Sequence, residues 1–412
     1  MKILSIRIPG RFEDAFIYRG HLLAITEEMS IRRYALNKLI ENLYNEFPSG
    51  IPVLSHLFLR NDWLGNEQFQ ALLSNPKIAH TFLTLFDSLE ALSVKSELNA
   101  PPQNEQALNL DARVVLDMDI YNDALYLGTD AGLYSSRIEV DNIKPVLMLN
   151  KRLDAPCLNT SARYGIIKAS CGQDGLFAAI EQQGGIWGQT AVLDLIAPES
   201  LRTGWLDYDI VNYPAQNEPR LIKTTHEKRT SSRAYAPSNE GTTLTHIDNS
   251  ETDLDYLLVA LESKFNVPAR RIQYTYNFLH HLFVQADDGT CYSISLSAST
   301  TEKVQTTHAK KYKHILSRIL GVNTTRVGQV IETVDGVYLF AKNELIQLID
   351  SGVLSVRTFG RSRRYKNIVL LTTENAILLM SVFDDSHYRV QNIDVADEFD
   401  SDPFGDSDPF EN

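Results

Sequence analysis

Cysteine, tryptophan and long apolar runs are scarce in this sequence, and each scarcity excludes a class of protein. The three cysteines, Cys157, Cys171 and Cys291, are too few for a disulfide framework among 412 residues, so we expect a reducing, cytoplasmic compartment. An uninterrupted apolar stretch of about 18 residues does not occur, so we expect no membrane-spanning helix. The first residues also lack the apolar core of a signal peptide.

Basic residues are missing from the last 19 residues, 394–412. This segment holds eight carboxylates, so the net charge of −13 leaves only −5 for the rest of the chain. We expect 394–412 to be a disordered acidic tail, because it has too little apolar surface to fold alone. The remaining body is only mildly acidic, and its composition is ordinary for a globular protein.

Motifs that carry catalysis or bind metal are also missing. The sequence holds no G-x-x-x-x-G-K-[ST] phosphate loop, no G-x-S-x-G elbow and no H-E-x-x-H zinc motif. Its one adjacent histidine pair, His280 and His281, would point to opposite faces of a strand and could not hold one ion together. Asp117, Asp119 and Asp123 lack the glycine and distal glutamate of a calcium loop. We therefore assign no catalytic residue, no metal site and no cofactor.

What the sequence does contain is a repeated hairpin. Leu125–Ser135 reads LYLGTDAGLYS, and Ser170–Ile180 echoes it as SCGQDGLFAAI, with the turn glycines Gly132 and Gly175 43 residues apart. One hairpin in every unit of about 40–50 residues is typical of the blades of a β-propeller. The pattern therefore predicts an all-β fold.

Seven segments carry two β-rich runs joined by a turn, which predicts seven blades, although six or eight also fit the spacing. They are Ala15–Leu36, Arg113–Val140, Ala162–Ile180, Trp205–Thr224, Tyr276–Leu296, Val334–Asp350 and Tyr365–Phe383. The opening run Lys2–Ile8 has no hairpin partner nearby. We expect it to pair with the C-terminal strands, closing the ring and removing two exposed sheet edges.

The hairpin LYLGTDAGLYS resembles the repeats of bacterial regulator-type and quinoprotein-like β-propellers. Such a resemblance implies a fold and a binding platform rather than one activity. The tryptophans of quinoprotein repeats are not reproduced, because Trp63, Trp187 and Trp205 do not recur with the blade period. A quinone cofactor is therefore not expected, and the missing Trp-Asp repeat ending departs from standard WD40 propellers.

Insertions interrupt the blades. We predict a propeller made of residues 1–36 and 111–393, with a helical insertion at 37–110. Its Pro76–Leu92 segment is amphipathic, and we expect its apolar stripe to dock on the propeller rather than face a partner. The other predicted features are helices at Tyr34–Phe47, Asn66–Ser74, Asp253–Phe265 and Thr307–Leu320, and a mobile polar loop at His226–Glu251.

The acidic tail repeats one motif, DSDPF, with Gly405 between the copies. We expect a protein partner with an apolar pocket rimmed by Lys or Arg to bind it, through Asp402, Pro403 and Phe404 or through Asp408, Pro409 and Phe410. These tripeptides resemble the DPF motifs that bind clathrin-adaptor appendages. The tail also resembles the acidic tip of bacterial single-stranded-DNA-binding proteins, although Glu411 and Asn412 follow the last Phe here. A solubilising tail without a partner is the alternative.

A basic stretch near the C-terminus is the other candidate contact. Arg357, Arg361, Arg363, Arg364 and Lys366 are interleaved with aromatic residues, and Lys310 and Lys311 could extend the patch. Arginine beside aromatics is the composition of a nucleic-acid interface, but this stretch could also hold the protein's own acidic tail or be a solvated loop.

The sequence thus favours a non-enzymatic scaffold in a multiprotein assembly, recruiting a partner through its DPF tail. A nucleic-acid-binding module that uses Arg357–Lys366 and a propeller enzyme with a site in its central channel remain the alternatives.

Overall fold

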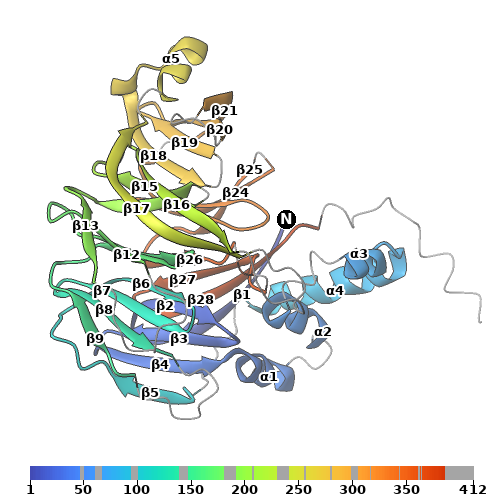
Figure 1. The fold of residues 1–412 in the computed structure, drawn as a ribbon. Coiled ribbons are helices and arrows are strands. Elements are labelled where there is room, and N and C mark those ends of the chain that lie inside the picture. The colour runs from blue at the N-terminus through green and yellow to red at the C-terminus, as the bar shows by residue number, and fades with distance from the viewer. Residues whose placement is uncertain are drawn as a thin grey trace, which may run out of the picture.

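Seven four-stranded antiparallel sheets form the blades of a β-propeller in this computed structural model (Figure 1). The structure describes residues 1–46, 51–60, 67–93, 101–138, 147–180, 192–206, 208–229, 241–254, 257–278, 281–297, 305–315, 317–342, 344–360, 362 and 364–385. Each of the seven predicted hairpin segments lies in a different sheet. The predicted all-β, seven-bladed fold is therefore confirmed, and the predicted acidic tail 394–412 lies outside the described residues.

Each blade is named here by its order in the chain. Blades 1 to 3 are β2 (Phe12–Tyr18), β3 (His21–Thr26), β4 (Ser30–Ala35), β5 (Asn104–Ala107); β6 (Val115–Tyr121), β7 (Ala124–Thr129), β8 (Gly132–Arg137), β9 (Asn150–Leu153); and β10 (Asn159–Arg163), β11 (Ile166–Ser170), β12 (Leu176–Ile180), β13 (Asp194–Ala197). Blades 4 and 5 are β14 (Arg202–Leu206), β15 (Asp209–Tyr213), β16 (Arg220–Arg229), β17 (Gly241–Asp253); and β18 (Ile272–Phe278), β19 (His281–Ala286), β20 (Thr290–Ser297), β21 (Gln305–His314). Blades 6 and 7 are β22 (Ile319–Thr324), β23 (Gln329–Thr333), β24 (Gly336–Ala341), β25 (Glu344–Ile349); and β26 (Val353–Thr358), β27 (Ile368–Thr373), β28 (Ala376–Phe383), β1 (Lys2–Pro9).

The N-terminal strand closes the ring. β1 pairs with β28 in an unbroken antiparallel register, from Lys2 opposite Phe383 to Pro9 opposite Ala376. Its alternate side chains Leu4, Ile6 and Ile8 are almost fully buried, because every second residue of the strand faces the core. This confirms the predicted pairing of the first residues with the C-terminal strands, which covers the outer edge of blade 7.

Strand direction gives the propeller two distinct faces. Neighbouring strands of a blade are antiparallel, so the first and third strands of every blade end on the same face. We call this the helical face, because helix α1 (Leu36–Glu46) begins directly after β4. The opposite face, where the first strands begin, is called the leucine face after Leu116, Leu158, Leu320 and Leu354, which stand at or beside those starts.

The helical insertion packs against the closing seam. After α1 it contains α2 (Ile51–Leu54), the π-helix η2 (Ser55–Leu59), α3 (Glu67–Leu73) and α4 (Pro76–Ser93). Helix α4 lies against β1, and the rings of Phe82 and Phe86 contact Phe383 at 5.8 and 6.0 Å between centroids. The apolar stripe therefore docks on the propeller as predicted, and helices α1 to α4 gather at one side of the ring (Figure 1). Two boundaries differ: Tyr34 still belongs to β4, and β5 is a blade strand within the predicted insertion.

Three predictions of local structure were wrong. The predicted helix at Thr307–Leu320 is strand β21 followed by the start of β22, and the predicted loop at His226–Glu251 lies mostly in the hairpin of β16 and β17. The predicted helix at Asp253–Phe265 shortens to α5 (Val259–Phe265), because Asp253 pairs with Arg220 as the end of β17. In each case, pairing with a neighbouring strand overrides a weak local preference.

Two turn glycines show why the repeat needs this residue. Gly132 in blade 2 and Gly336 in blade 6 begin the third strand of their blades with φ angles of +147° and +145°. A Cβ atom there would lie 2.1 Å from the Leu153 carbonyl oxygen and 2.4 Å from that of Ile349, the last residues of the fourth strands. The fourth strand can therefore approach only where the turn carries no side chain.

Candidate functional site

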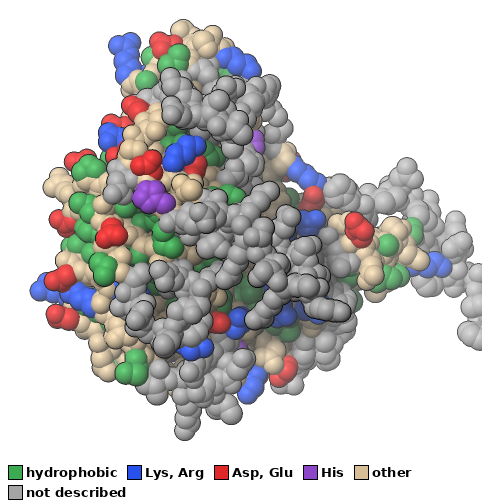
Figure 2. All heavy atoms as spheres, viewed as in Figure 1, with side chains coloured by type: hydrophobic (Ala, Val, Ile, Leu, Met, Phe, Trp, Pro, Cys, Tyr) green, Lys and Arg blue, Asp and Glu red, His purple; other side chains and the backbone are tan. Residues whose placement is uncertain are grey.

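The central channel encloses about 1390 Å³ that is open to solvent. Residues of the first strands of all the blades line it, because these strands contact one another in a ring. On the face shown in Figure 2, Lys and Arg side chains are interspersed with Asp and Glu side chains among the described residues. In the channel, the type of side chain changes with depth. Polar and charged groups lie in the middle, and the two mouths carry different side chains.

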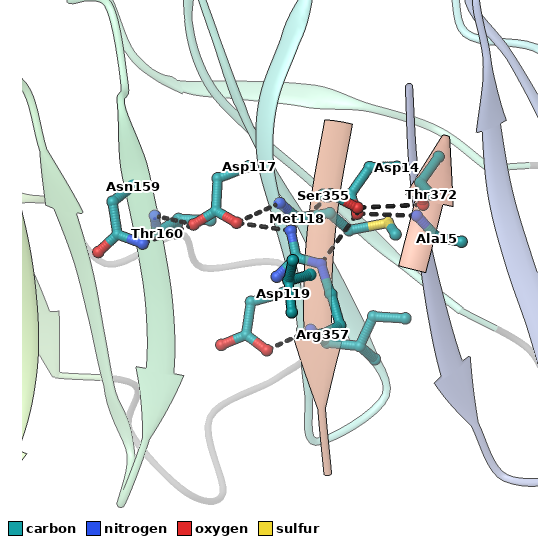
Figure 3. A network of polar contacts seen from close by, with 12 residues as sticks. Asp14, Ala15, Asp117, Met118, Asp119, Asn159, Thr160, Ser355, Arg357 and Thr372 are labelled. Carbon is teal, nitrogen blue, oxygen red and sulfur yellow. Dashed lines mark hydrogen bonds and ion pairs between the residues drawn. The ribbon is translucent and has the colours of Figure 1, made fainter. Parts of the chain in front are cut away.

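A half-buried arginine joins three blades inside the channel (Figure 3). Arg357 on β26 donates from Nε to Oδ1 of Asp14 over 2.9 Å and from Nη2 to Oδ1 of Asp117 over 2.6 Å. Nη2 also pairs with Oδ2 of Asp14, and Ser355 Oγ donates to Asp14 Oδ1 over 2.7 Å. Blade 7 is thereby tied to blades 1 and 2 by charge-assisted hydrogen bonds.

Burial and charge oppose each other in this cluster. Burial alone would lower the pKa of Arg357, but the carboxylates of Asp14 and Asp117 reverse this and raise it. Burial raises the pKa of Asp117 although Arg357 opposes the shift. At the next channel-facing position, burial raises the pKa of Asp119 to about 6. Asp119 Oδ2 accepts a hydrogen bond from the Ala162 amide over 2.8 Å, so it links blade 2 to blade 3.

Hydrogen bonds continue this belt around the ring. Asp117 Oδ2 accepts from Asn159 Nδ2 over 2.7 Å and from the Thr160 amide over 2.8 Å. Asn277 Nδ2 donates to the Trp205 carbonyl over 2.6 Å, which links blade 5 to blade 4. Asn323 Nδ2 reaches the Val356 carbonyl of blade 7 over 3.2 Å. Such bonds fix each first strand against its neighbour, which makes the channel wall a rigid frame.

On the helical face, Arg163 and Trp205 line the channel, and Tyr164 and Tyr208 lie beside them. Arg163, at the end of β10, lies 5.0 Å from the ring of Tyr164 and 5.8 Å from that of Trp205. The ring of Tyr208 lies 4.7 Å from that of Tyr164, between centroids, at a tilt of 56°, and Trp205 donates from Nε1 to Ser161 Oγ over 3.0 Å. We call Arg163, Tyr164, Trp205 and Tyr208 the aromatic mouth. Tyr164 and Tyr208 remain 36% and 43% exposed, so the cluster offers ring surface to a ligand.

A buried lysine supports the aromatic mouth from behind. Lys168 on β11 has no exposed surface, its Nζ lies 3.9 Å from the Trp205 ring, and it donates to the Gly204 carbonyl over 2.7 Å. Burial holds the pKa of Lys168 well below its usual range. The cation–π contact and the hydrogen bond hold the indole in place.

Exposed leucines surround the mouth on the leucine face. Leu116, Leu158, Leu320 and Leu354 line the channel and are 42–50% exposed. Leu116, Leu320 and Leu354 share one structural position, the extra residue of a β-bulge in the first strand of blades 2, 6 and 7. A bulge leaves its extra residue unpaired and turns its side chain away from the sheet. The same bulge position holds Glu13 in blade 1 and Gln273 in blade 5, so the fold repeats the position and the sequence places an exposed leucine there in blades 2, 6 and 7.

The structure separates the predicted basic contact residues. Both Arg357 and Arg364 line the channel, but Arg357 is half-buried and paired with two carboxylates, while Arg364 is exposed. Lys366 is half-buried after it, and the exposed Lys311 lies on β21 of blade 5, with blade 6 between the two groups. Lys310 is also on β21. Arg361, Arg363 and the tail residues Asp402, Pro403, Phe404, Asp408, Pro409 and Phe410 lie outside the described residues.

Sequence reasoning missed the aromatic mouth and the role of Asp14. Asp14 and Asp117 both follow a bulge at the same register position of β2 and β6, and an alignment of the blades would have matched them.

No cluster of three or more metal-ligating side chains occurs among the residues that the structure describes. Within the same residues, none of the helices is long and apolar enough to cross a membrane.

Solved structures share this fold. The β-propeller domain of Cps50 (Swd1) from Myceliophteria thermophila is 7% identical, covering 92% of this chain and 98% of that one, with a TM-score of 0.49. The WD40 β-propeller domain of Doa1 is 9% identical over 94% and 98% of the two chains, with a TM-score of 0.45. BBS1N, solved in complex with ARL6DN, is 11% identical over 94% and 99%, with a TM-score of 0.45.

The chain is a β-propeller protein. A scan against protein families found no match, and neither did a search of curated proteins. At these identities and TM-scores, the similarity to the three solved structures indicates nothing about function. The finer resemblance to regulator-type or quinoprotein-like propellers therefore stays a prediction.

Proposed function

We propose that this protein is a scaffold that holds a protein partner on the leucine face and recruits a second contact through its DPF tail. The observation that carries the proposal is the set of exposed leucines around the channel mouth. Exposed apolar side chains that cluster around a concave site are typical of protein interaction surfaces. The hydrogen-bonded belt beneath them keeps the surface rigid, so little conformational entropy is lost when a partner binds.

The tail adds a flexible arm to this rigid platform. Phe404 or Phe410 would enter an apolar pocket of the partner, and the surrounding carboxylates would attract Lys or Arg at its rim. Burial of one Phe side chain contributes about 2 kcal/mol, so a single motif gives weak binding. Two copies on one chain raise the chance that one is always engaged.

Affinity purification with quantitative mass spectrometry tests the proposal. Partners recovered with the wild-type chain should be lost when Leu320→Asp and Leu354→Asp are combined. They should be retained with Leu72→Asp, which puts the same charge on a side chain that is 53% exposed on α3. Phe404→Ala combined with Phe410→Ala should release the partners that depend on the tail. An unchanged set of proteins with the leucine variant would refute the role of the leucine face.

A further inference from the structure

The aromatic mouth contains an arginine that forms no direct ion pair with a described carboxylate. Among the described residues, Arg163 has no carboxylate within 4.0 Å, and its closest contacts are the rings of Tyr164 and Trp205. Burial lowers the pKa of Arg163, although the nearby Asp119 carboxylate opposes this shift. A half-buried guanidinium that has lost water without gaining a carboxylate favours the binding of an anion.

A second arginine that lines the channel also forms no direct ion pair with a described carboxylate. Arg364 lines the channel, is exposed and has no carboxylate within 4.0 Å in the part of the chain that the structure describes. Other arginines that line the channel are paired, since Arg19 lies 2.8 Å from Asp123 and Arg357 holds Asp14 and Asp117. The channel therefore presents two available guanidinium groups.

The acidic tail leaves the propeller on the face that carries the aromatic mouth. β28 is the third strand of blade 7, so it ends on the helical face, as β10 does in blade 3. The Met1 amino group fixes this point by an ion pair of 2.8 Å with Asp385. The 19 residues from Asp385 to Phe404 can span at most about 65 Å, whereas the first and third strands of a blade lie about 10 Å apart. The tail is long enough to reach the channel.

We infer that the aromatic mouth binds the chain's own DSDPF motifs. The ring of Phe404 or Phe410 packs on Tyr164, Tyr208 and Trp205, while a flanking carboxylate pairs with Arg163. Arg364, which lines the channel from blade 7, attracts the other carboxylates of the tail. Both halves of the motif match this site, since it offers aromatic surface beside a guanidinium that has no direct ion pair. The inference rests on the tail's proposed role as a recruiting arm. The tail is then bound to its own propeller until a partner with a tighter pocket displaces it from the channel.

A competition experiment tests this contact in the full chain. The probe is a fluorescein-labelled peptide of residues 397–412, and its binding is measured by fluorescence anisotropy. The chain carrying Phe404→Ala and Phe410→Ala should bind the peptide at least 10-fold more tightly than the wild-type chain, because the wild-type tail competes at an effective concentration of the order of millimolar. Equal affinity for the two chains would overturn the inference.

Variants of the mouth locate the contact. Arg163→Gln or Tyr208→Ala, added to the tail variant, should each weaken peptide binding about 10-fold. Lys311→Gln, which removes an exposed positive charge from blade 5, should leave it unchanged. Far-ultraviolet circular dichroism checks that each variant is folded, and Tyr208→Ala provides a test if Arg163→Gln is not. Unaltered binding by a folded mouth variant would contradict the proposed site.

Partner capture separates this inference from the proposed function. An immobilised peptide of residues 397–412 should capture the tail-dependent partners whether or not the propeller binds it. If it captures them but does not bind the propeller, the recruiting role stands and the contact between the tail and its own propeller is refuted. If both contacts exist, Arg163→Gln should increase the yield of these partners with the full-length chain.

Discussion

Arg357 and Asp14 are 343 positions apart in the sequence, and they meet across the junction of the last blade and the first, with 2.9 Å between Nε and Oδ1. The ring is therefore closed in two independent ways. β1 completes blade 7 by backbone pairing with β28, and the ion pair then fixes blade 7 to blade 1. The pairing of β1 with β28 covers the sheet edge of blade 7, while the ion pair determines how blade 7 fits against blade 1.

Loss of Arg357 should destabilise the ring. Arg357→Gln would leave the carboxylates of Asp14 and Asp117 buried without a counter-charge, since their side chains are only 4% and 13% exposed. We expect the free energy of unfolding, measured by urea denaturation, to fall by about 3–5 kcal/mol. Arg271→Gln is the matched control, because Arg271 also bridges two carboxylates, Asp287 and Asp288, but at the surface. Its loss should cost less than about 1 kcal/mol, and equal losses would contradict this account.

The turn glycines should tolerate no side chain. Gly132→Ala places a Cβ atom against the Leu153 carbonyl and forces an L residue to φ +147°, so we expect destabilisation by about 3 kcal/mol in thermal or urea unfolding. Gly336→Ala should behave alike, because it occupies the equivalent turn. Gly20→Ala, where φ is +82° but no atom lies within 4 Å, isolates the backbone effect and should cost only about 1 kcal/mol. A Gly20 variant as unstable as the Gly132 variant would disprove the steric explanation.

Asp119 should make stability depend on pH. Burial raises its pKa from 3.8 to about 6 in the folded chain, so the folded chain binds this proton more tightly than the unfolded chain does. Ionisation of Asp119 therefore destabilises the fold increasingly between pH values of about 4 and 6, and the full effect persists above that range. Asp119→Asn keeps an oxygen for the Ala162 amide and should be roughly 1–2 kcal/mol more stable than the wild type at pH 7.5.

Urea unfolding of the Asp119 variant between pH 4.5 and 7.5 checks this sign. The advantage of Asp119→Asn should shrink toward pH 4.5, where the wild-type side chain is largely protonated in the fold. Asp350→Asn makes the same charge change at an exposed position and should show no such trend. A variant that is less stable than the wild type at pH 7.5 would show that the carboxylate is needed where it stands.

Some parts of the fold were predictable because their signals are local. The hairpin around Gly132 recurs at the blade period, and the spacing of the apolar residues in α4 predicts both the helix and its apolar face. A stronger repeat signal was present but unused: Thr129 Oγ1 donates to the Gly132 carbonyl over 2.8 Å, and Thr333 Oγ1 does the same to Gly336 over 3.0 Å. β21 was mistaken for a helix because only its pairing with β20 stabilises it as a strand.

The sequence alone determined the blades and the closing strand, because alternation, turn residues and repeat spacing act between near neighbours in the chain. The tertiary structure decided which charges are available. Arg357 was predicted as a surface contact but is half-buried and paired with two carboxylates, whereas Arg163, which no motif singled out, lines the channel without a direct ion pair to a described carboxylate. The physical reason is ring closure, which brings first strands that are distant in sequence to within hydrogen-bond distance of each other. The partner of a channel residue therefore depends on which blade the closed ring places beside it.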